Sequence, residues 1–258
     1  MPEGDTLFRT ALGLRPHLVG RTVTAARARQ PGPKAHRLVG ATVTSVEAAG
    51  KNLLITFDNG LELRTHLRMK GSWHRYRPGE RWRRPEARAR LVLEVPGAVA
   101  VCFDAPVVEL FEARATKLHP ALSRLGPDLL SADVDEGQAV RNLRDPARAS
   151  WTIAEALLDQ RALAGIGNIW KNETLWTEHV NPWARVRELD DEALGRLVAT
   201  ARRLLQASVA TARPPVMNVY GRTGRPCRRC GTMIRAQRQG RDLPRTTYWC
   251  ERCQDNPR

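Results

Sequence analysis

The sequence has no apolar run that approaches the ~20 residues of a membrane-spanning helix, and its first residues lack the apolar core of a secretory signal. Cysteine is also scarce: only one, Cys102, lies before residue 219. It is part of the apolar run Val99–Phe103. Cys102 is therefore expected to be a small core residue. These absences argue against a membrane protein and favour the reducing cytoplasm.

Acidic residues are fewer than basic ones. The 258 residues include 42 Lys+Arg and 27 Asp+Glu, which gives a formal net charge of +15. Such a field attracts phosphate backbones, so nucleic acid is the expected partner, although a membrane-surface or ribosomal protein has similar composition. The length allows one large domain or two modest ones, together with a small third element.

Four cysteines form two pairs near the carboxyl end, Cys227-x2-Cys230 and Cys250-x2-Cys253. Two such pairs are typical of a zinc ribbon, in which four thiolates complete one tetrahedron; a pair of disulfides is the alternative. The sequence therefore predicts one structural Zn2+, which cannot activate water because protein fills every coordination position. Residues 219–258 also contain 10 Arg, no Lys and 3 acidic residues, so this finger is expected to meet a polyanion.

The first half of the chain reads as a helix followed by strands. Leu7, Ala11, Leu14 and Leu18 recur at helical spacing, and Pro16 is expected to kink or end that helix early. Strand-like runs follow, separated by turns such as Asp58-Asn-Gly60, and they favour a sandwich or a barrel. The runs are Thr42–Glu47, Asn52–Phe57, Leu61–Leu67, Arg90–Val95 and Val99–Phe103, and the Pro/Arg-rich stretches Gln30–Arg37 and Arg75–Arg88 read as surface loops.

From about residue 131 the pattern becomes helical. Asp133 and Ser150 are expected to cap two helices, and a further long helix should start at Asp190 or Asp191. Between them, Ala164-Gly-Ile-Gly-Asn168 leads into a helix over residues 169–179. Its glycines and the amides that open the helix could seat a phosphate, although an ordinary turn has the same sequence. Strands first, helices second and a zinc tail last predict a two-lobed α+β protein.

The chain starts Met1-Pro2-Glu3-Gly4. Removal of Met1 would leave the secondary amine of Pro2, which attacks an aldehyde-level carbon when neutral. Glu3 could then supply a proton to a leaving or ring oxygen.

Five separated motifs occur in one order: the Pro-Glu-Gly start, Gly50-Lys-Asn52, Arg124-Leu-Gly-Pro-Asp128, Leu163-Ala-Gly-Ile-Gly-Asn168, and the finger with Arg245-Thr-Thr-Tyr-Trp-Cys250. Together they resemble the formamidopyrimidine-DNA glycosylase / endonuclease VIII family of base-excision repair enzymes. The resemblance implies that DNA binds in a cleft between two lobes. It also implies three domains: an N-terminal β-sandwich with a leading helix (1–116), a helix–two-turns–helix domain (117–214) and a zinc finger (215–258).

The resemblance also implies the chemistry. Pro2 would attack C1′ of a damaged nucleotide that has been flipped out of the duplex, and Glu3 would protonate the sugar at O4′. The resulting Schiff base allows β- and then δ-elimination of the two flanking phosphates. Lys51 matches a family lysine that contacts phosphate and assists elimination, and Arg245 matches the finger arginine that grips phosphates beside the lesion.

Other residues match DNA-binding positions. Arg124 and Asn168, with Gly167 in the preceding turn, would hold phosphates and position the DNA without reading its sequence. The stretch His66–Gly71, with Arg68 and Met69 at its tip, matches the loop that fills the space left by the flipped base. A methionine in a core strand is the competing interpretation of Met69.

The opening Pro-Glu-Gly-Asp-Thr and the short stretch Ala207–Tyr220 favour the endonuclease VIII branch and hence oxidised pyrimidines. The family often has a carboxylate at position 6, where this chain has Thr6, so Asp5 is the candidate substitute. A glycosylase directed at 8-oxoguanine and formamidopyrimidines, a non-catalytic damaged-DNA-binding paralogue, and a zinc-ribbon RNA-binding protein are the alternatives. A monomer that acts on damaged double-stranded DNA in the bacterial cytoplasm, at the nucleoid, is the expected state.

Overall fold

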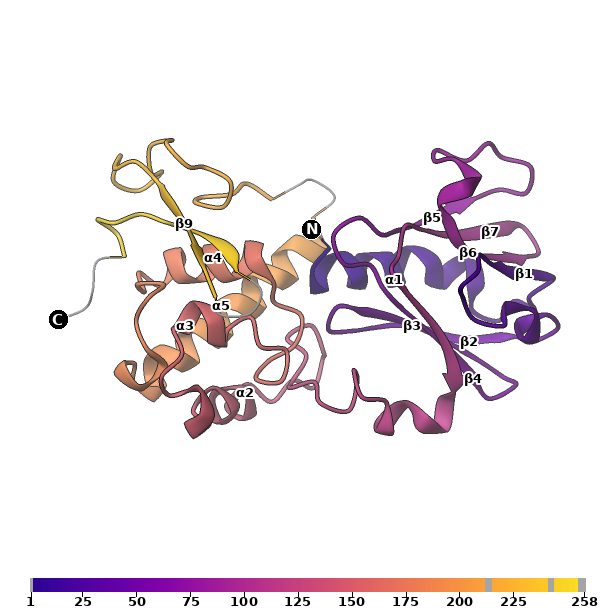
Figure 1. Ribbon diagram of the computed structural model, residues 1–258, viewed down its shortest axis with the longest axis horizontal. Coiled ribbons are helices and arrows are strands. Elements are labelled where there is room, and N and C mark those ends of the chain that lie inside the picture. Colours follow the sequence, from indigo (N-terminus) through magenta and orange to yellow (C-terminus); the bar gives the residue numbers. More distant parts are fainter. Residues whose placement is uncertain (1, 212–214, 241–243, 255–258) are drawn as a thin grey trace. The chain divides into compact units, whose positions relative to one another are not determined.

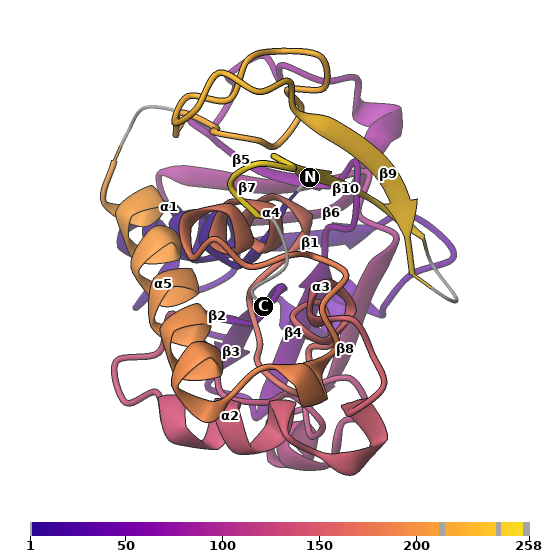
Figure 2. The ribbon, with the colours of Figure 1, turned by 90° about the vertical axis from the view of Figure 1, so that its left-hand side faces the viewer.

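The computed structural model describes residues 2–211, 215–240 and 244–254. The chain forms two compact units, Met1–Ser123 and Arg124–Arg258 (Figure 1, Figure 2). The domain boundaries expected at residues 116/117 and 214/215 stay predictions, and residue 214 lies outside the described residues.

The first unit is a sandwich of two four-stranded antiparallel sheets, which confirms the N-terminal β-sandwich expected for this α+β protein. One sheet has the order β2-β3-β4-β8, from β2 (Val43–Ala49), β3 (Asn52–Phe57), β4 (Leu61–His66) and β8 (Val107–Glu112). The other has the order β1-β6-β7-β5, from β1 (Ala25–Ala28), β6 (Ala89–Val95), β7 (Ala98–Phe103) and β5 (Ser72–Tyr76).

Helix α1 (Gly4–Leu18) packs on this sandwich through the four residues that the periodicity identified, all of which are buried in the main core. The helix continues past Pro16 to Leu18, so the expectation of an early end is wrong. Proline removes one backbone hydrogen bond, but packing of the apolar face supplies most helix stability in a folded protein. Arg15 adds a local contact, because its guanidinium donates to the backbone oxygen of Val46 at 3.0 and 3.2 Å.

The expected strands are present within two residues of their predicted ends, whereas three other strands of the first unit were not predicted. Strand β1 has the sequence Ala-Ala-Arg-Ala and shows no alternation of apolar and polar residues. Strand β8 is half exposed along its length. Strand β5 continues to Tyr76, so the surface loop expected from Arg75 begins two residues later. A strand of low apolar content is fixed by its neighbours in the sheet more than by its own pattern.

The described residues of the second unit form four α-helices and a hairpin. The elements are α2 (Glu136–Leu143), α3 (Ile153–Ala156), α4 (Asn168–Thr177), α5 (Asp191–Ala210), β9 (Arg235–Gln239) and β10 (Arg245–Trp249). Short 3-10 helices complete the description of both units, at Ala35–Leu38, Glu86–Arg88, Ala113–Leu118, Pro146–Arg148 and Val186–Glu188.

Two of the three expected helix caps are wrong. Asp135, not Asp133, caps α2 by accepting from the backbone of Gln138. Thr152, not Ser150, caps α3 in a reciprocal pair with Glu155, which satisfies amide groups that the helix leaves open. Asp190 caps α5, as one of the two expected choices. No helix in the described part of the chain is both long and apolar enough to span a bilayer.

Candidate active site and zinc centre

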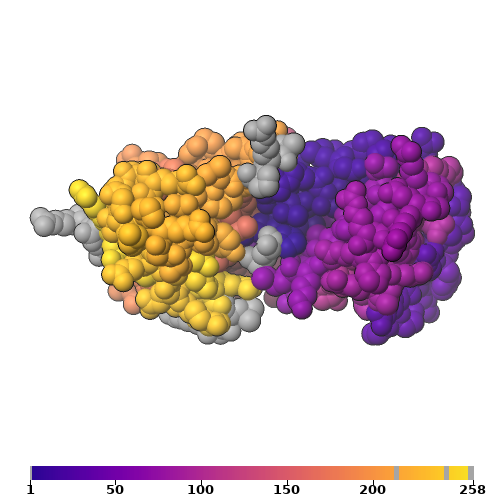
Figure 3. Space-filling view, turned by 90° about the horizontal axis from the view of Figure 1, so that it is seen from above, coloured from indigo at the N-terminus to yellow at the C-terminus, as the bar shows by residue number. Residues whose placement is uncertain are grey.

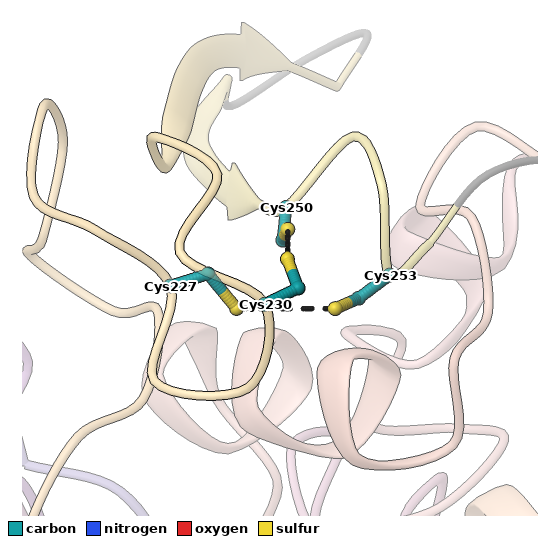
Figure 4. Close-up of side chains that lie close together, drawn as sticks. All are labelled: Cys227, Cys230, Cys250 and Cys253. Carbon is teal, nitrogen blue, oxygen red and sulfur yellow. Dashed lines mark hydrogen bonds between the residues drawn. The ribbon is translucent and has the colours of Figure 1, made fainter.

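The four cysteines of the finger converge on one point (Figure 4). Their sulfur atoms all lie within 4.8 Å of one another, and Sγ of Cys227 is 3.9 Å from Sγ of Cys253. Sγ of Cys230 is 3.4 Å from Sγ of Cys250. A tetrahedron with Zn–S bonds of about 2.3 Å places its sulfurs about 3.8 Å apart, so this arrangement fits one Zn2+. All five cysteines of the chain are free thiols, which removes the disulfide alternative.

The four thiols of this site do not ionise equally easily, because their surroundings shift their pKa values in different directions. Hydrogen bonds from the side chain and backbone of Thr232 lower the pKa of Cys230 to about 6. Burial and the neighbouring thiols raise the pKa of Cys253 to about 12. Four thiolates at this spacing repel one another, so a bound cation is what allows all four to ionise.

Each pair of cysteines is held by a turn that packs on helix α4. The indole N–H of Trp176 donates to Sγ of Cys227 at 3.4 Å. The backbone N–H of Cys250 donates to the side-chain oxygen of Gln254 at 3.0 Å, and Gln254 in turn donates to the backbone oxygen of Val180. The sulfurs therefore belong to the same small core as Trp176, Val219 and Ile234.

Helix α4 also holds strand β10 through three consecutive pairs of residues. The amide of Asn168 donates to the backbone oxygen of Thr246 at 2.8 Å. The ammonium of Lys171 donates to the hydroxyl of Thr247 at 2.8 Å, and the side-chain oxygen of Asn172 accepts from the backbone of Tyr248 at 3.0 Å. Because Arg245 directly precedes these residues, its backbone is fixed relative to the start of α4.

Glu173 fixes the segment that leads into the finger. Its carboxylate is 3% exposed and accepts four hydrogen bonds, at 2.9–3.0 Å. The donors are the backbone amides of Asn218, Val219 and Tyr220 and the side-chain amide of Asn218. A buried carboxylate needs such a set of donors to offset its desolvation.

The Gly-Ile-Gly turn opens α4. Gly165 has φ of 99°, a conformation that glycine adopts without strain, and Gly167 is the N-cap residue. The side chain of Gln160 holds the turn, because its amide donates to the backbone oxygen of Ile166 at 3.0 Å and its oxygen accepts from the backbone of Gly165 at 3.2 Å. The structure thus brings Gly167, Asn168 and Arg245 together within the second unit.

Arg124 lies at the start of the same unit and is exposed. Two residues later, Gly126 packs so closely on the backbone that a Cβ there would lie 2.5 Å from the oxygen of Ala162. Asp128 then pairs with Ala164 in a parallel bridge, immediately before the Gly-Ile-Gly turn. The Arg124–Asp128 motif is therefore packed against the segment that enters this turn.

In the first unit, Pro2 and Glu3 precede helix α1. Pro2 is partly exposed, whereas Glu3 is fully buried. Helix α1 runs against strand β2, with Gly20 bonded to Val43 and Arg15 bonded to Val46. From Arg15 the helix rises about 16 Å to its start, and from Val46 the strand rises about 17 Å to Lys51. Pro2, Glu3 and Lys51 therefore lie toward the same end of the sandwich.

The loop His66–Gly71 reaches that end as well, because Asn52 is paired with His66 across β3 and β4. Met69 is 59% exposed, so the interpretation of this residue as part of a core strand is wrong. Arg68, beside it, is exposed and has φ of 45°. We call residues 66–71 the wedge loop. Its closure is tight, since a Cβ on Gly71 would lie 2.6 Å from the backbone oxygen of Leu67.

His66 reports the electrostatics of this end of the sheet. Burial, followed by the positive charges of Arg64, Lys51 and Arg68, lowers the pKa of His66 from 6.5 to about 4. The imidazole is therefore neutral at pH 7, and its Nδ1 accepts from the backbone of Arg68 at 3.2 Å. Cations gathered around a neutral ring indicate a surface suited to an anionic ligand.

Asp5 lies in the first turn of α1 and is 5% exposed. Its carboxylate is 3.2 Å from the guanidinium of Arg9, and the hydroxyl of Thr6 is 3.5 Å from its other oxygen. A buried carboxylate is thus present one residue before the position at which the resemblance implies one.

Several positioning residues were missed by sequence reasoning, namely Gln160, Lys171, Asn172 and Glu173. Three of them lie in α4, where eight of ten residues are buried, including the charged ones. Charged residues on a helix normally face water, and the pattern of α4 gives no sign that a finger covers its polar side. The one available signal is the crowding of polar residues between the aromatic residues Trp170 and Trp176.

Sequence models of three domain families match the chain in order. They describe a formamidopyrimidine-DNA glycosylase N-terminal domain (residues 1–106), a formamidopyrimidine-DNA glycosylase H2TH domain (residues 125–216) and a zinc finger found in FPG and IleRS (residues 224–256).

Curated relatives match over almost the whole length. "Probable endonuclease 8 2" of Streptomyces coelicolor is 42% identical over 100% of this chain and 95% of the relative. "DNA-(apurinic or apyrimidinic site) lyase Nei2" of Mycolicibacterium smegmatis is 39% identical over 98% of this chain and 99% of the relative. "Endonuclease 8" of Escherichia coli is 30% identical over 98% and 100%.

Solved structures share the fold. A Lactococcus lactis formamidopyrimidine-DNA glycosylase with DNA that contains an abasic site has a TM-score of 0.84 at 22% identity, and covers 98% of this chain and 100% of its own. MutM in complex with DNA that contains carbocyclic 8-oxoguanine has a TM-score of 0.86 at 22% identity, over 99% and 100%. With the three domain families in order and a relative that is 42% identical over its full length, the chain belongs to the formamidopyrimidine-DNA glycosylase / endonuclease VIII family.

Proposed function

We propose that this protein excises oxidised pyrimidines from double-stranded DNA and then cuts the strand through a Schiff base at Pro2. As a member of its family, the chain is a DNA glycosylase and AP lyase of base-excision repair. The observation that carries the residue assignments is the placement of Pro2, the buried Glu3 and Lys51 toward one end of the sandwich.

In the proposed reaction, the amine of Pro2 attacks C1′ and the carboxyl group of Glu3 protonates O4′ as the sugar ring opens. The base leaves, and an iminium joins Pro2 to the opened sugar. The iminium acidifies the C2′ protons, so loss of one of them expels the 3′ phosphate, and a second elimination expels the 5′ phosphate. Asp5, buried in the same turn, supplies the second carboxylate in place of Thr6.

Lys51 supports these steps by binding a phosphate next to the lesion. Its charge is already felt at His66, so it acts at the end of the sheet where the wedge loop begins. Met69 enters the duplex as an apolar wedge when the damaged nucleotide leaves the stack, and exposed Arg68 flanks it.

In the second unit, Arg245, Asn168 and Arg124 hold phosphates on either side of the lesion. An amide nitrogen carries two hydrogens, so Asn168 keeps one for a phosphate after donating the other to Thr246. The side-chain oxygen of Asn168 is buried without a hydrogen-bond partner, which leaves the donor side of this amide as its functional side. Gly167, without a side chain, lets the backbone that opens α4 approach the phosphate.

The preference for pyrimidines is supported by the Pro-Glu-Gly start and by the endonuclease 8 names of the curated relatives. The segment between α5 and the finger is short; residues 212–214 of it lie outside the described residues. A glycosylase that prefers 8-oxoguanine is the second candidate, because the structurally similar MutM is bound to DNA that contains that lesion analogue. We also propose that the protein acts as a monomer in the bacterial cytoplasm, at the nucleoid, without a membrane partner.

Borohydride trapping tests this proposal. The purified protein would be mixed with duplexes that contain dihydrouracil, 8-oxoguanine or an abasic site, and covalent adducts would be measured with and without chemical blocking of the Pro2 amine. We expect adducts that vanish on blocking, with dihydrouracil ahead of 8-oxoguanine. The reverse order would assign the purine preference. Tight binding without an adduct on any duplex would identify a non-catalytic damaged-DNA-binding protein, and stronger binding to RNA would favour the zinc-ribbon alternative.

A further inference from the structure

A loop rich in arginine connects β5 to β6 and plays no part in the chemistry above. We call residues 77–88 the arginine loop; it contains five arginines and two glutamates. It covers the outer face of sheet β1-β6-β7-β5, where it closes a small core that is separate from the main one. The space-filling view shows the violet and magenta stretch that includes this loop at the surface of its unit (Figure 3).

Aromatic contacts anchor the loop. The ring of Trp82 stacks on Tyr76 at a centroid distance of 6.0 Å and meets the edge of Phe103 at 5.8 Å. The backbone N–H of Arg83 donates to the hydroxyl of Tyr76 at 3.0 Å. The guanidinium of Arg27 lies over Trp82 at 5.6 Å. The backbone of the loop is therefore fixed before any partner binds, which lowers the entropy cost of binding.

The arginines of the loop fall into two groups. Arg84 and Arg88 share one counter-ion, because a nitrogen of each lies 2.7 Å from the carboxylate of Asp104. Arg77, Arg81 and Arg83 are exposed, and no ion pair joins any of them to a carboxylate in the described part of the chain. Three guanidinium groups are thus presented to solvent from an anchored backbone.

The loop begins far from the wedge loop and returns to it. Arg77 lines a hollow with Pro96 and Gly97, at the distal end of the sheet. Seven residues later, the guanidinium of Arg84 is 3.4 Å from the backbone oxygen of Lys70 in the wedge loop. Strand β5 spans about 13 Å between these ends. One DNA strand carries a phosphate every 3.4 Å along the axis, so the loop is long enough to face about four of them.

We propose that the arginine loop binds backbone phosphates of undamaged duplex DNA next to the lesion, through Arg77, Arg81 and Arg83. The proposal rests on the proposed function, because Lys70 links the loop to the wedge that enters the duplex. A guanidinium fork matches phosphate oxygens. An acidic protein is the less favoured partner, because Trp82 packs inward and the loop lacks the exposed aromatic centre that protein interfaces use.

The salt dependence of binding tests this directly. The double variant Arg81→Gln/Arg83→Gln would be compared with Arg21→Gln/Arg37→Gln in the full-length protein, on an undamaged duplex. Both control arginines are exposed and form no ion pair within the described residues. The backbone oxygen of Arg21 accepts a hydrogen bond from Val43, and that of Arg37 accepts one from Asn59. Both therefore lie at the end of the sheet away from Lys51. The two variants lose the same charge, so only the position differs.

Each phosphate contact contributes about 0.9 to the slope of log K against log salt concentration. Loss of two contacts should therefore lower the slope by about 1.8, so that the wild-type affinity falls roughly tenfold more than that of the variant between 50 and 200 mM salt. The control should keep the wild-type slope. Single-turnover cleavage of an abasic duplex at saturating protein should stay within about twofold in the control variant, because Arg21 and Arg37 lie away from Lys51 and the wedge loop.

An unchanged slope in the arginine-loop variant, or an equal fall in the control, would overturn the proposal. Loss of polyglutamate binding with an unchanged DNA slope would overturn it too and would assign the loop to an acidic protein. Failure of the proposed function is a separate result, because it appears as a missing borohydride adduct in the wild-type protein.

Discussion

The ammonium of Lys171 and the hydroxyl of Thr247 are 2.8 Å apart, and both side chains are almost completely buried. Thr247 passes this contact on, because its hydroxyl donates to Gln239 at 2.8 Å and Gln239 donates to Thr152 at 2.9 Å. A chain of hydrogen bonds thus runs from α4 across the hairpin to the cap of α3. The strand that carries Arg245 is held to the helical core on both sides, as the phosphate contact that we propose for Arg245 requires.

Replacement of Glu173 by Gln should destabilise the second unit. The new NH2 group would face some of the N–H donors that now bind the carboxylate, which leaves buried donors unpaired at about 1–3 kcal/mol each. We expect the free energy of unfolding to fall by about 3 kcal/mol in chemical denaturation. Glu192→Gln is the matched control: it breaks an exposed pair with Arg196 and should cost under about 0.5 kcal/mol. Equal stability of the two variants would contradict the role of Glu173.

Replacement of Glu3 by Gln should separate binding from chemistry. The variant keeps its shape and should bind a dihydrouracil duplex nearly as well as the wild type. Excision in single-turnover experiments should slow by about 100-fold or more, because the proton donor is lost. Glu47→Gln, at an exposed carboxylate paired with Arg15, is expected to excise at the wild-type rate. Full activity in Glu3→Gln would remove this residue from the role of general acid.

Replacement of Met69 by Ala should impair lesion processing without affecting the fold. The side chain is mostly exposed, so the unfolding free energy should change by less than about 0.5 kcal/mol, whereas extrusion of the damaged nucleotide loses its wedge. Leu67→Ala, two residues earlier and 1% exposed, should show the opposite pattern, with a loss of about 2–4 kcal/mol. A calorimetric scan and an excision assay on both variants would distinguish the two roles.

Removal of zinc should weaken DNA binding and loosen the finger. Cys250→Ser should lower the zinc content from one ion per chain toward zero, as measured by atomic emission, because a tetrahedral site with three thiolates is much weaker. Cys102→Ala offers the control, since Cys102 is buried in the sandwich and should keep one zinc. Retention of zinc and DNA affinity in Cys250→Ser would contradict the assignment.

Acid should destabilise the first unit through His66. Its pKa is about 4 in the folded chain and 6.5 in the unfolded chain, so between these values the unfolded state binds the extra proton. The contribution is complete above pH 6.5 and is lost as the pH falls toward 4. We expect a loss of roughly 1–2 kcal/mol, less than the full shift implies because solvent screens the partly exposed ring.

His66→Gln should flatten the stability curve over this range, as measured by denaturant titration at several pH values. His74 contributes in the same direction, because burial and then Arg84 and Arg83 lower its pKa as well. Some slope should therefore remain in the single variant. A slope as steep as that of the wild type would exclude the contribution of His66.

The zinc ligands, the family and the sandwich could be predicted because their signals are local. The spacing of Cys227 and Cys230 alone predicts that they are zinc ligands, and the strands that enter the main core are apolar. The predicted helix caps lie two residues before the observed caps, Asp135 and Thr152, because several residues near each helix start can cap equally well.

The buried polar residues of α4 could not be predicted for a different reason. Lys171, Asn172 and Glu173 are buried by partners 45–76 residues away in sequence, which no local pattern records. Similarly, the stretch that became the arginine loop was recognised as surface, but its anchoring by Trp82 depends on Tyr76 and Phe103 from two different strands.

The burial of α4 on all sides has a consequence for how this protein is assembled and how it can change. One side of the helix packs against the zinc finger, and the other packs into the helical core. A truncated chain that lacked the finger would expose Trp176 and leave the carboxylate of Glu173 without its hydrogen-bond donors. The zinc finger and the helical core should therefore melt in a single transition. A finger transplanted from another protein would fit only together with the helix beneath it.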